Sequence, residues 1–297
     1  MSVTGAVYDR GYRPYEGERG GRADARWALL RLSVRRALGL RRSWRQKVFP
    51  WSLLGIATIP AIINVGVGYL TQDSPIEDFE FFTYREYVGV STALLLFVAL
   101  TAPDIVCPDR RNRVLPLLFA RPLTGTDYVA AKVGAMALIL FGFSFIPQVV
   151  LFVGQLLVTD DGALEYFTDN VEVLWQVPVA VAILSLHYAA IGVALSATTA
   201  RRVVGGVAIL ALALVTSAVA GIVTEVQAGD EGSSWWALVN VLALPLHVRD
   251  LVFLGHLDPD GPLSGLSGAG VAVVAESVVI LGACLLFLRR RYREVNV

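Results

Sequence analysis

The sequence has little charge for its length. Lys, Arg, Asp and Glu together make up 17% of the 297 residues, whereas apolar residues make up 55%. A soluble domain of this size carries more charge, so the composition excludes an ordinary soluble protein and predicts a membrane protein. The formal net charge is zero, which becomes informative only when the charges are placed along the chain.

Residues that catalyse reactions or bind metals are also scarce. Both cysteines, Cys107 and Cys284, fall beside predicted inner membrane boundaries, so we expect free thiols rather than a disulfide. His187, His247 and His256 are scattered and fit no metal or protease spacing. No glycine-rich loop precedes a Lys-Ser or Lys-Thr pair, which excludes ATP binding of the P-loop type. We therefore expect no catalytic residue, no metal and no cofactor in this chain.

Long apolar runs dominate what is present. A helix needs about 20 residues to cross the hydrocarbon layer, and six runs are long enough: 49–70, 87–106, 129–158, 171–196, 203–226 and 269–287. The stretch 234–256 is apolar at first but contains Pro245, His247, Arg249 and Asp250. We interpret it as two short helices, broken at Pro245, that dip into the outer leaflet. The predicted fold is an all-α integral membrane protein with six transmembrane helices and a re-entrant extracellular helical hairpin before the last span.

The placement of charge gives an orientation. Lys and Arg occur in the N-terminal arm, within 109–132, at Arg201 and Arg202, and within 289–293, whereas the other loops carry mostly acids. The exceptions are Arg85 and Arg249. Because basic residues are retained on the cytoplasmic side, both termini are predicted to be cytoplasmic and the number of spans to be even.

Two segments precede the first span. Residues 1–22 are rich in Gly, Arg and Tyr and are interpreted as a cytoplasmic tail; the first apolar run begins too late for a signal peptide. Residues 23–47 are predicted to form an amphipathic connecting helix, with Trp27, Leu30, Val34 and Leu38 on one side and arginines on the others. Such a helix belongs in the headgroup layer, where arginines contact anionic lipids. A solvated helix is the alternative.

The segment 103–128, between the second and third spans, joins a cluster of arginines to a short apolar patch around Leu117. A short helix with an exposed apolar patch at the membrane surface suits docking to another protein. Pro122 is expected to end this helix. Thr124 and Asp127 predict a capping box that starts the next one.

The run VLPLLFARPLTGTDYVAAK at 114–132 resembles the first cytoplasmic loop of ABC-2 type transporter permeases, in which a charged segment leads into a sequence like TLxLLLxRPLSRxxYxxGK. This chain departs from that pattern at Arg113-Val114, where the family often has Gly-Thr, at Gly125, where it has a basic residue, and at Ala131, where it has Gly. The span count and the loop layout also agree, so the resemblance covers most of the chain, with 48–297 as the six-span domain.

The resemblance implies a function. It predicts a permease subunit of a bacterial plasma-membrane exporter that forms a homodimer, pairs with a separate ABC ATPase, and binds membrane lipids but no nucleic acid. ATP and Mg²⁺ are expected in that partner, and the cargo is expected to be amphipathic or hydrophobic. The residues predicted to contact the ATPase are Asp109, Arg110, Arg111, Arg113, Leu117, Leu118 and Arg121. Arg201 and Arg202 are secondary candidates, or simple orientation signals.

Polar side chains within the spans are candidates for a substrate pathway, because an ionised carboxylate in mid-membrane costs about 3 kcal/mol. Glu276 is interpreted either as a pathway or dimer contact or as a protonated packing group. His187 fits packing or ligand contact, and Gln148 and Gln155 line a cavity or join helices. Two other functions stay open: a proton-coupled transporter using Glu276 and His187, and a membrane assembly or immunity factor.

Overall fold

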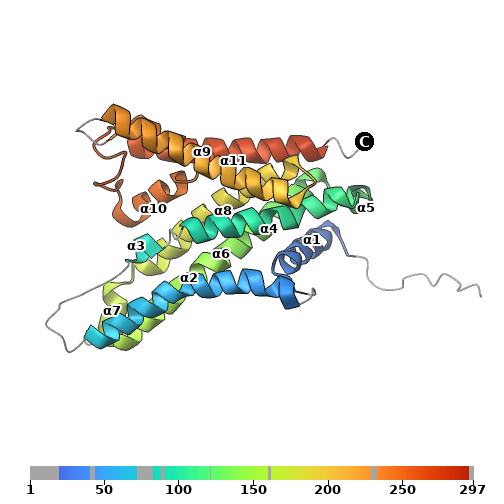
Figure 1. The fold of residues 1–297 in the computed structure, drawn as a ribbon. Helices are drawn as coiled ribbons and strands as arrows, with labels where there is room; N and C mark the ends of the chain where they lie inside the picture. The colour runs from blue at the N-terminus through green and yellow to red at the C-terminus, as the bar shows by residue number, and fades with distance from the viewer. Residues whose placement is uncertain are drawn as a thin grey trace, which may run out of the picture.

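The computed structural model describes residues 20–40, 44–71, 83–87, 91–120, 122–159, 162–228 and 233–293. All regular elements in these ranges are helices (Figure 1). The prediction of an all-α chain is therefore confirmed for the described residues.

Five helices in the described ranges are long and apolar enough to cross a membrane. They are α2 (Trp44–Thr71), α6 (Gly125–Val158), α8 (Val173–Thr198), α9 (Arg202–Ala228) and α11 (Ala269–Arg293), and they cover five of the six predicted spans. The remaining predicted span, 87–106, corresponds to α4 (Ser91–Arg111), which is continuous over 21 residues but carries charged groups in its second half. α4 is not among the five.

Helix α8 forms the centre of the bundle. It is apolar around its whole circumference, as expected for a helix that has neighbours on every side. Of the residues in its most apolar 18-residue stretch, 72% are buried inside the protein. It contacts α4, α6, α9, α10 (Leu244–Leu254) and α11. By contrast, only 17%, 17% and 11% of the residues in the corresponding 18-residue stretches of α2, α9 and α11 are buried. These three helices present apolar surface outward, which is the pattern of helices that face lipid.

Glycines allow close contact between α9, α8 and α4. A Cβ on Gly206 of α9 would lie 2.6 Å from the carbonyl oxygen of Ala99 on α4. A Cβ on Gly192 of α8 would lie 2.7 Å from Cγ1 of Val98. Helices in lipid associate through such close approaches, because lipid removes the hydrophobic driving force between them.

The amphipathic helix is present as α1 (Arg22–Ala37). It ends earlier than predicted, and residues 44–47 belong to α2. Its inward face, which includes Leu29, Ser33 and Ala37, is buried against the bundle, where α1 contacts α6 and α4. Trp27, predicted on the apolar side, is 58% exposed. α1 is thus packed along the bundle through most of its length.

Short helices cap the two ends of the bundle. α5 (Leu115–Phe119) follows α4 at one end, while α3 (Tyr84–Tyr87), α7 (Ala163–Asp169), η2 (Trp235–Val239) and α10 lie at the other (Figure 1). η2 and α10 are the two short helices predicted before the last span. The predicted break at Pro245 is displaced: residues 240–243 separate the helices, and Pro245 lies in the first turn of α10. Proline is tolerated there because a first-turn N–H has no intrahelical partner.

Gly206→Ala is expected to destabilise the bundle by roughly 1–3 kcal/mol, because the added methyl group forces α9 away from the α4 backbone. Thermal unfolding of the purified protein in detergent measures the loss. Gly221→Ala is the matched control on α9, since a Cβ there has no atom within 4 Å, and the higher helix propensity of Ala should leave stability unchanged or slightly raised. Equal losses in the two variants would contradict the close contact.

Candidate functional site

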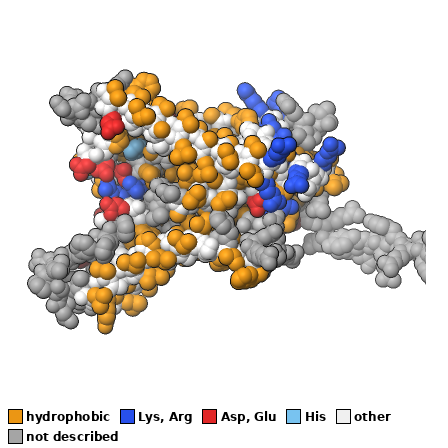
Figure 2. Space-filling view, in the orientation of Figure 1, with side chains coloured by type: hydrophobic (Ala, Val, Ile, Leu, Met, Phe, Trp, Pro, Cys, Tyr) orange, Lys and Arg blue, Asp and Glu red, His pale blue; other side chains and the backbone are white. Residues whose placement is uncertain are grey.

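Positive charge gathers at the end of the bundle that carries α5 (Figure 2). The start of α1, the end of α4, the start of α6 and the end of α11 meet at this end, because Arg22 pairs with Asp127 and the ring of Tyr292 contacts that of Tyr128. The first and last helices of the described chain, α1 and α11, thus each contact α6 here.

A buried carboxylate organises this end. The Asp109 side chain is 4% exposed and that of Lys132 is 2% exposed, and Oδ2 of Asp109 lies 2.6 Å from Nζ of Lys132. The other oxygen, Oδ1, lies 2.6 Å from Nη1 of Arg36, and the Tyr128 hydroxyl donates to Oδ2 at 3.0 Å. We call Arg36, Asp109, Tyr128 and Lys132 the Asp109 cluster; it joins α1, α4 and α6.

The local sequence explains why the cluster forms. Asp109 lies in the last turn of α4, where the helix dipole disfavours an anion, so the carboxylate needs cations. Tyr128 and Lys132 are four residues apart on α6 and therefore share one face. Lys132 also donates to the Ile105 carbonyl at 2.9 Å, and its Nζ lies 5.2 Å from the centroid of the Tyr128 ring. The buried ammonium is thus surrounded by acceptors.

Helix α11 is held against the same cluster. The rings of Tyr128 and Tyr292 have centroids 4.7 Å apart, and Tyr292 is 2% exposed. A Cβ on Gly125 would lie 2.7 Å from the Tyr292 carbonyl oxygen. Only glycine therefore lets the first turn of α6 approach the end of α11 this closely.

The start of α6 is the predicted capping box. The Thr124 hydroxyl accepts from the Asp127 N–H at 3.3 Å, and Asp127 Oδ2 accepts from the Thr124 N–H at 3.0 Å, so this prediction is confirmed. Arg22 adds a second link from α1, with Nε 2.7 Å from Asp127 Oδ2. α1 is therefore tied to the bundle at both of its ends, through Asp127 and through Asp109.

The residues predicted to contact an ATPase differ in exposure. Asp109 is buried, and Arg110 is partly buried and donates to the Ala197 carbonyl. Arg111 and Arg113 are exposed. On α5, Leu117 is 72% exposed, whereas Leu118 packs against the core. Arg121 lies outside the described residues.

The loop between α4 and α5 has a defined backbone. The Val114 N–H donates to the Asp109 carbonyl at 3.1 Å and the Arg113 N–H to the Arg110 carbonyl at 3.2 Å, which is a Schellman motif. Its left-handed position is Arg113, with φ of 49°. Glycine normally occupies that position.

The four candidate pathway residues are not brought together. Gln148 donates to the Tyr84 carbonyl at 3.1 Å, and Gln155 faces Gly68 of α2. Nε2 of His187 lies 3.1 Å from the carbonyl oxygen of Val241. Glu276 is half-buried on α11. No hydrogen bond or ion pair in the described ranges joins any two of these four side chains.

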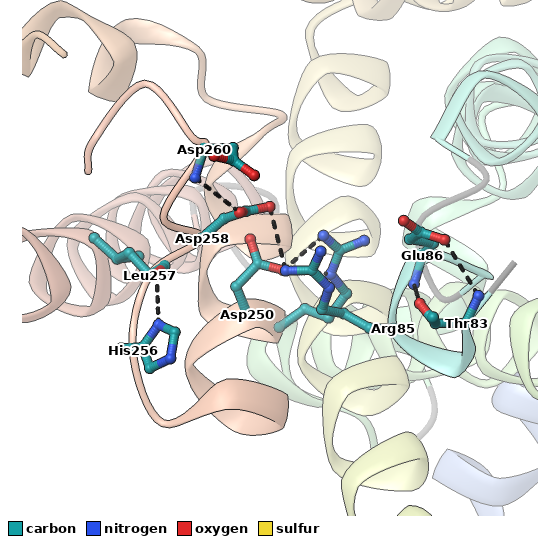
Figure 3. Close-up of polar contacts among 9 residues, drawn as sticks. Thr83, Arg85, Glu86, Asp250, His256, Leu257, Asp258 and Asp260 are labelled. Atoms are coloured by element: carbon teal, nitrogen blue, oxygen red, sulfur yellow. Dashed lines mark hydrogen bonds and ion pairs between the residues drawn. The ribbon is translucent and has the colours of Figure 1, made fainter. Parts of the chain in front are cut away.

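The opposite end of the bundle contains Arg85 and Arg249, the two exceptions to the clustering of basic residues on the predicted cytoplasmic side. Nη1 of Arg85 lies 3.2 Å from Asp258 Oδ2 and 3.8 Å from Asp250 Oδ1, and Nη2 of Arg249 lies 2.6 Å from the same Asp250 oxygen. Figure 3 shows Arg85 directed at both carboxylates. Both arginines are therefore neutralised by acids. The sequence signal was the adjacent pair Arg249-Asp250, but Asp258 is 173 residues from Arg85 and could not be assigned to it.

Comparison of the chain with protein-family models, curated proteins and solved structures found no match.

Asp109→Asn is expected to lower the free energy of unfolding by about 3–5 kcal/mol, because it leaves the Lys132 ammonium buried without a facing charge. Unfolding in detergent, followed by tryptophan fluorescence, measures the loss. Adding Lys132→Met to this variant should restore part of it.

Asp104→Asn is the control for this prediction. Asp104 Oδ1 lies 2.8 Å from Nη1 of Arg202, in a pair whose side chains are 28% and 42% exposed. Such a pair contributes at most about 1 kcal/mol. If the two variants lost similar amounts of unfolding free energy, burial of the Asp109 cluster would not be the cause of the loss.

Proposed function

We propose that this chain is the membrane-spanning permease subunit of an ATP-binding-cassette exporter of the ABC-2 type, in a bacterial plasma membrane. It crosses the bilayer six times, with the basic end in the cytoplasm. The five apolar helices support membrane insertion. As the sixth span, α4 has 21 residues, which corresponds to about 30 Å of helix, and it contacts both α8 and α9 along the bundle.

The separation of charge supports the orientation. Lys and Arg gather at the end with α5, whereas acids gather at the end with α3 and α10 (Figure 2). The two arginines at the acidic end are paired with Asp250 and Asp258, so they add no net positive charge there. Positive charge is retained inside, so in this proposal η2 and α10 form the re-entrant element at the outer surface. Trp235 and Trp236, 47% and 44% exposed, suit an outer interface.

One observation supports a role in coupling to an ATPase: the exposed residues of the loop and of α5 lie directly beside the buried Asp109 cluster. Arg111, Arg113 and Leu117 are exposed on the loop and on α5, and Asp109, two residues before Arg111, is fixed to α1 and α6. A force on the loop therefore reaches several helices at once.

The proposed mechanism follows from this arrangement. ATP and Mg²⁺ bind in the partner ATPase, whose closure pushes on the exposed surface of α5. Because the Asp109 cluster resists separation, α1, α4 and α6 move together, and the permease rocks against a second copy to move an amphipathic or hydrophobic cargo outward. Asp109 links three helices inside the permease, while Arg111, Arg113 and Leu117 face the ATPase.

Arg111→Glu combined with Arg113→Glu is expected to lower the amount of ATPase that co-purifies with the tagged permease by about tenfold, because the reversal removes two cations from the proposed contact and puts two anions in their place. The measurement is co-purification with the ATPase encoded beside the permease, followed by ATP hydrolysis in lipid. Folding is checked by unfolding temperature.

The control reverses two other exposed arginines at the same end, Arg289→Glu with Arg290→Glu, both on α11. This variant should retain the partner. If both double variants lose the ATPase equally, general charge attraction explains the binding. If neither does, the docking surface is elsewhere.

A further inference from the structure

A cavity of about 410 Å³ opens at the acidic end, between α9, η2 and α10. The face of α9 that lines it carries Ser217, Gly221, Thr224 and Glu225, spaced at helical intervals. Most of the rest of α9 is apolar, so this face concentrates the polar groups of the outer half of the helix. Apolar walls with a few convergent polar groups are typical of ligand sites of this size.

The acceptor that this cavity offers to a ligand is the Glu225 carboxylate. No hydrogen bond or ion pair within the described part of the chain engages the Glu225 carboxylate. The Thr224 hydroxyl is buried and has no partner among those same residues. Asn240 lies across from α9, where its Oδ1 accepts from Ser217 at 3.2 Å. A carboxylate beside these groups favours a ligand with donors or positive charge.

Positive charge is absent from the lining. No Lys or Arg is among the described residues that line the cavity. The nearest cation in sequence, Arg249, is paired with Asp250. Burial lowers the pKa of His247, which lines the cavity, and Arg249 adds to this shift while Asp250 opposes it. An anionic ligand in this cavity would face the Glu225 charge, with no Lys or Arg among the described lining residues to offset it.

A second cavity lies beside the first, on the side of α4 and α8. It has a volume of about 200 Å³, shares Ser217, Asn240 and Ala243 with the first, and reaches Leu95 on α4 and Tyr188 on α8. Its other walls are the apolar side chains of Ala213, Leu242 and Leu246. Polar and apolar side chains line both cavities, and Glu225 is the acid that lines the first.

We propose that the first cavity binds a small amphipathic organic cation, with the ammonium group beside Glu225 and the apolar part against the walls formed by Ala220, Ala237 and Pro262. A divalent metal is a poorer occupant, because no group of three or more metal-ligating side chains exists within the described ranges. The site belongs to this chain alone. It does not rest on an ATPase partner, so its test is separate from that of the proposed function.

The test uses the full-length permease in phospholipid nanodiscs and radiolabelled benzyltrimethylammonium in equilibrium dialysis, with empty nanodiscs subtracted. Saturable binding is expected, and benzenesulfonate, an aromatic anion of comparable size, should bind at least tenfold more weakly. Glu225→Gln keeps the shape but removes the charge and should raise the Kd about tenfold. Glu165→Gln is the control, because Glu165 is an exposed acid on α7 that does not line the cavities, and it should leave the Kd unchanged.

A second variant tests the position without altering charge. A Cβ on Gly221 meets no atom within 4 Å, so Gly221→Leu should fill the cavity without disturbing the helix packing and should abolish binding. The proposal is overturned if benzenesulfonate binds as tightly as the cation, if Glu225→Gln leaves the Kd unchanged, or if correctly folded Gly221→Leu still binds.

Discussion

The ion pair between Asp109 and Lys132 is the constraint on which the rest of the structure depends. Two charges that are almost completely buried are tolerated only when they face each other and their remaining hydrogen-bonding capacity is met. Arg36, Tyr128 and the Ile105 carbonyl meet it, so three helices are fixed at one point. Tyr292 and Gly125 add the last helix.

The two ends of the bundle use charge in different ways. At the basic end, one buried carboxylate collects cations from α1 and α6, and exposed arginines are left over on the loop to α5. At the acidic end, two carboxylates neutralise Arg85 and Arg249, and Glu225 is left facing a cavity. In the proposals made above, Arg111 and Arg113 contact the ATPase at one end, and Glu225 contacts a cationic ligand at the other.

Local patterns in the sequence predicted local structure well. The capping box at Thr124 and Asp127 depends on groups three residues apart, and the apolar runs depend on composition alone, so both were predictable. Asp109 was interpreted as a surface residue because its partner Arg36 is 73 residues away and no pattern links them. The break before α10 was misplaced because Pro245 favours a first helical turn as well as a break. Cavities depend on how helices pack, which the sequence does not specify residue by residue.

The most direct test of the account is a photo-cross-link from α5. Leu117, 72% exposed, is replaced by p-benzoylphenylalanine, the tagged permease is irradiated in native membranes, and the adduct is identified by mass spectrometry. Leu164 on α7, 79% exposed at the opposite end, serves as the control position. The account predicts an adduct with an ATP-hydrolysing subunit from position 117 and none from position 164. Irradiation that gives no such adduct from position 117, or equal adducts from both positions, would contradict it.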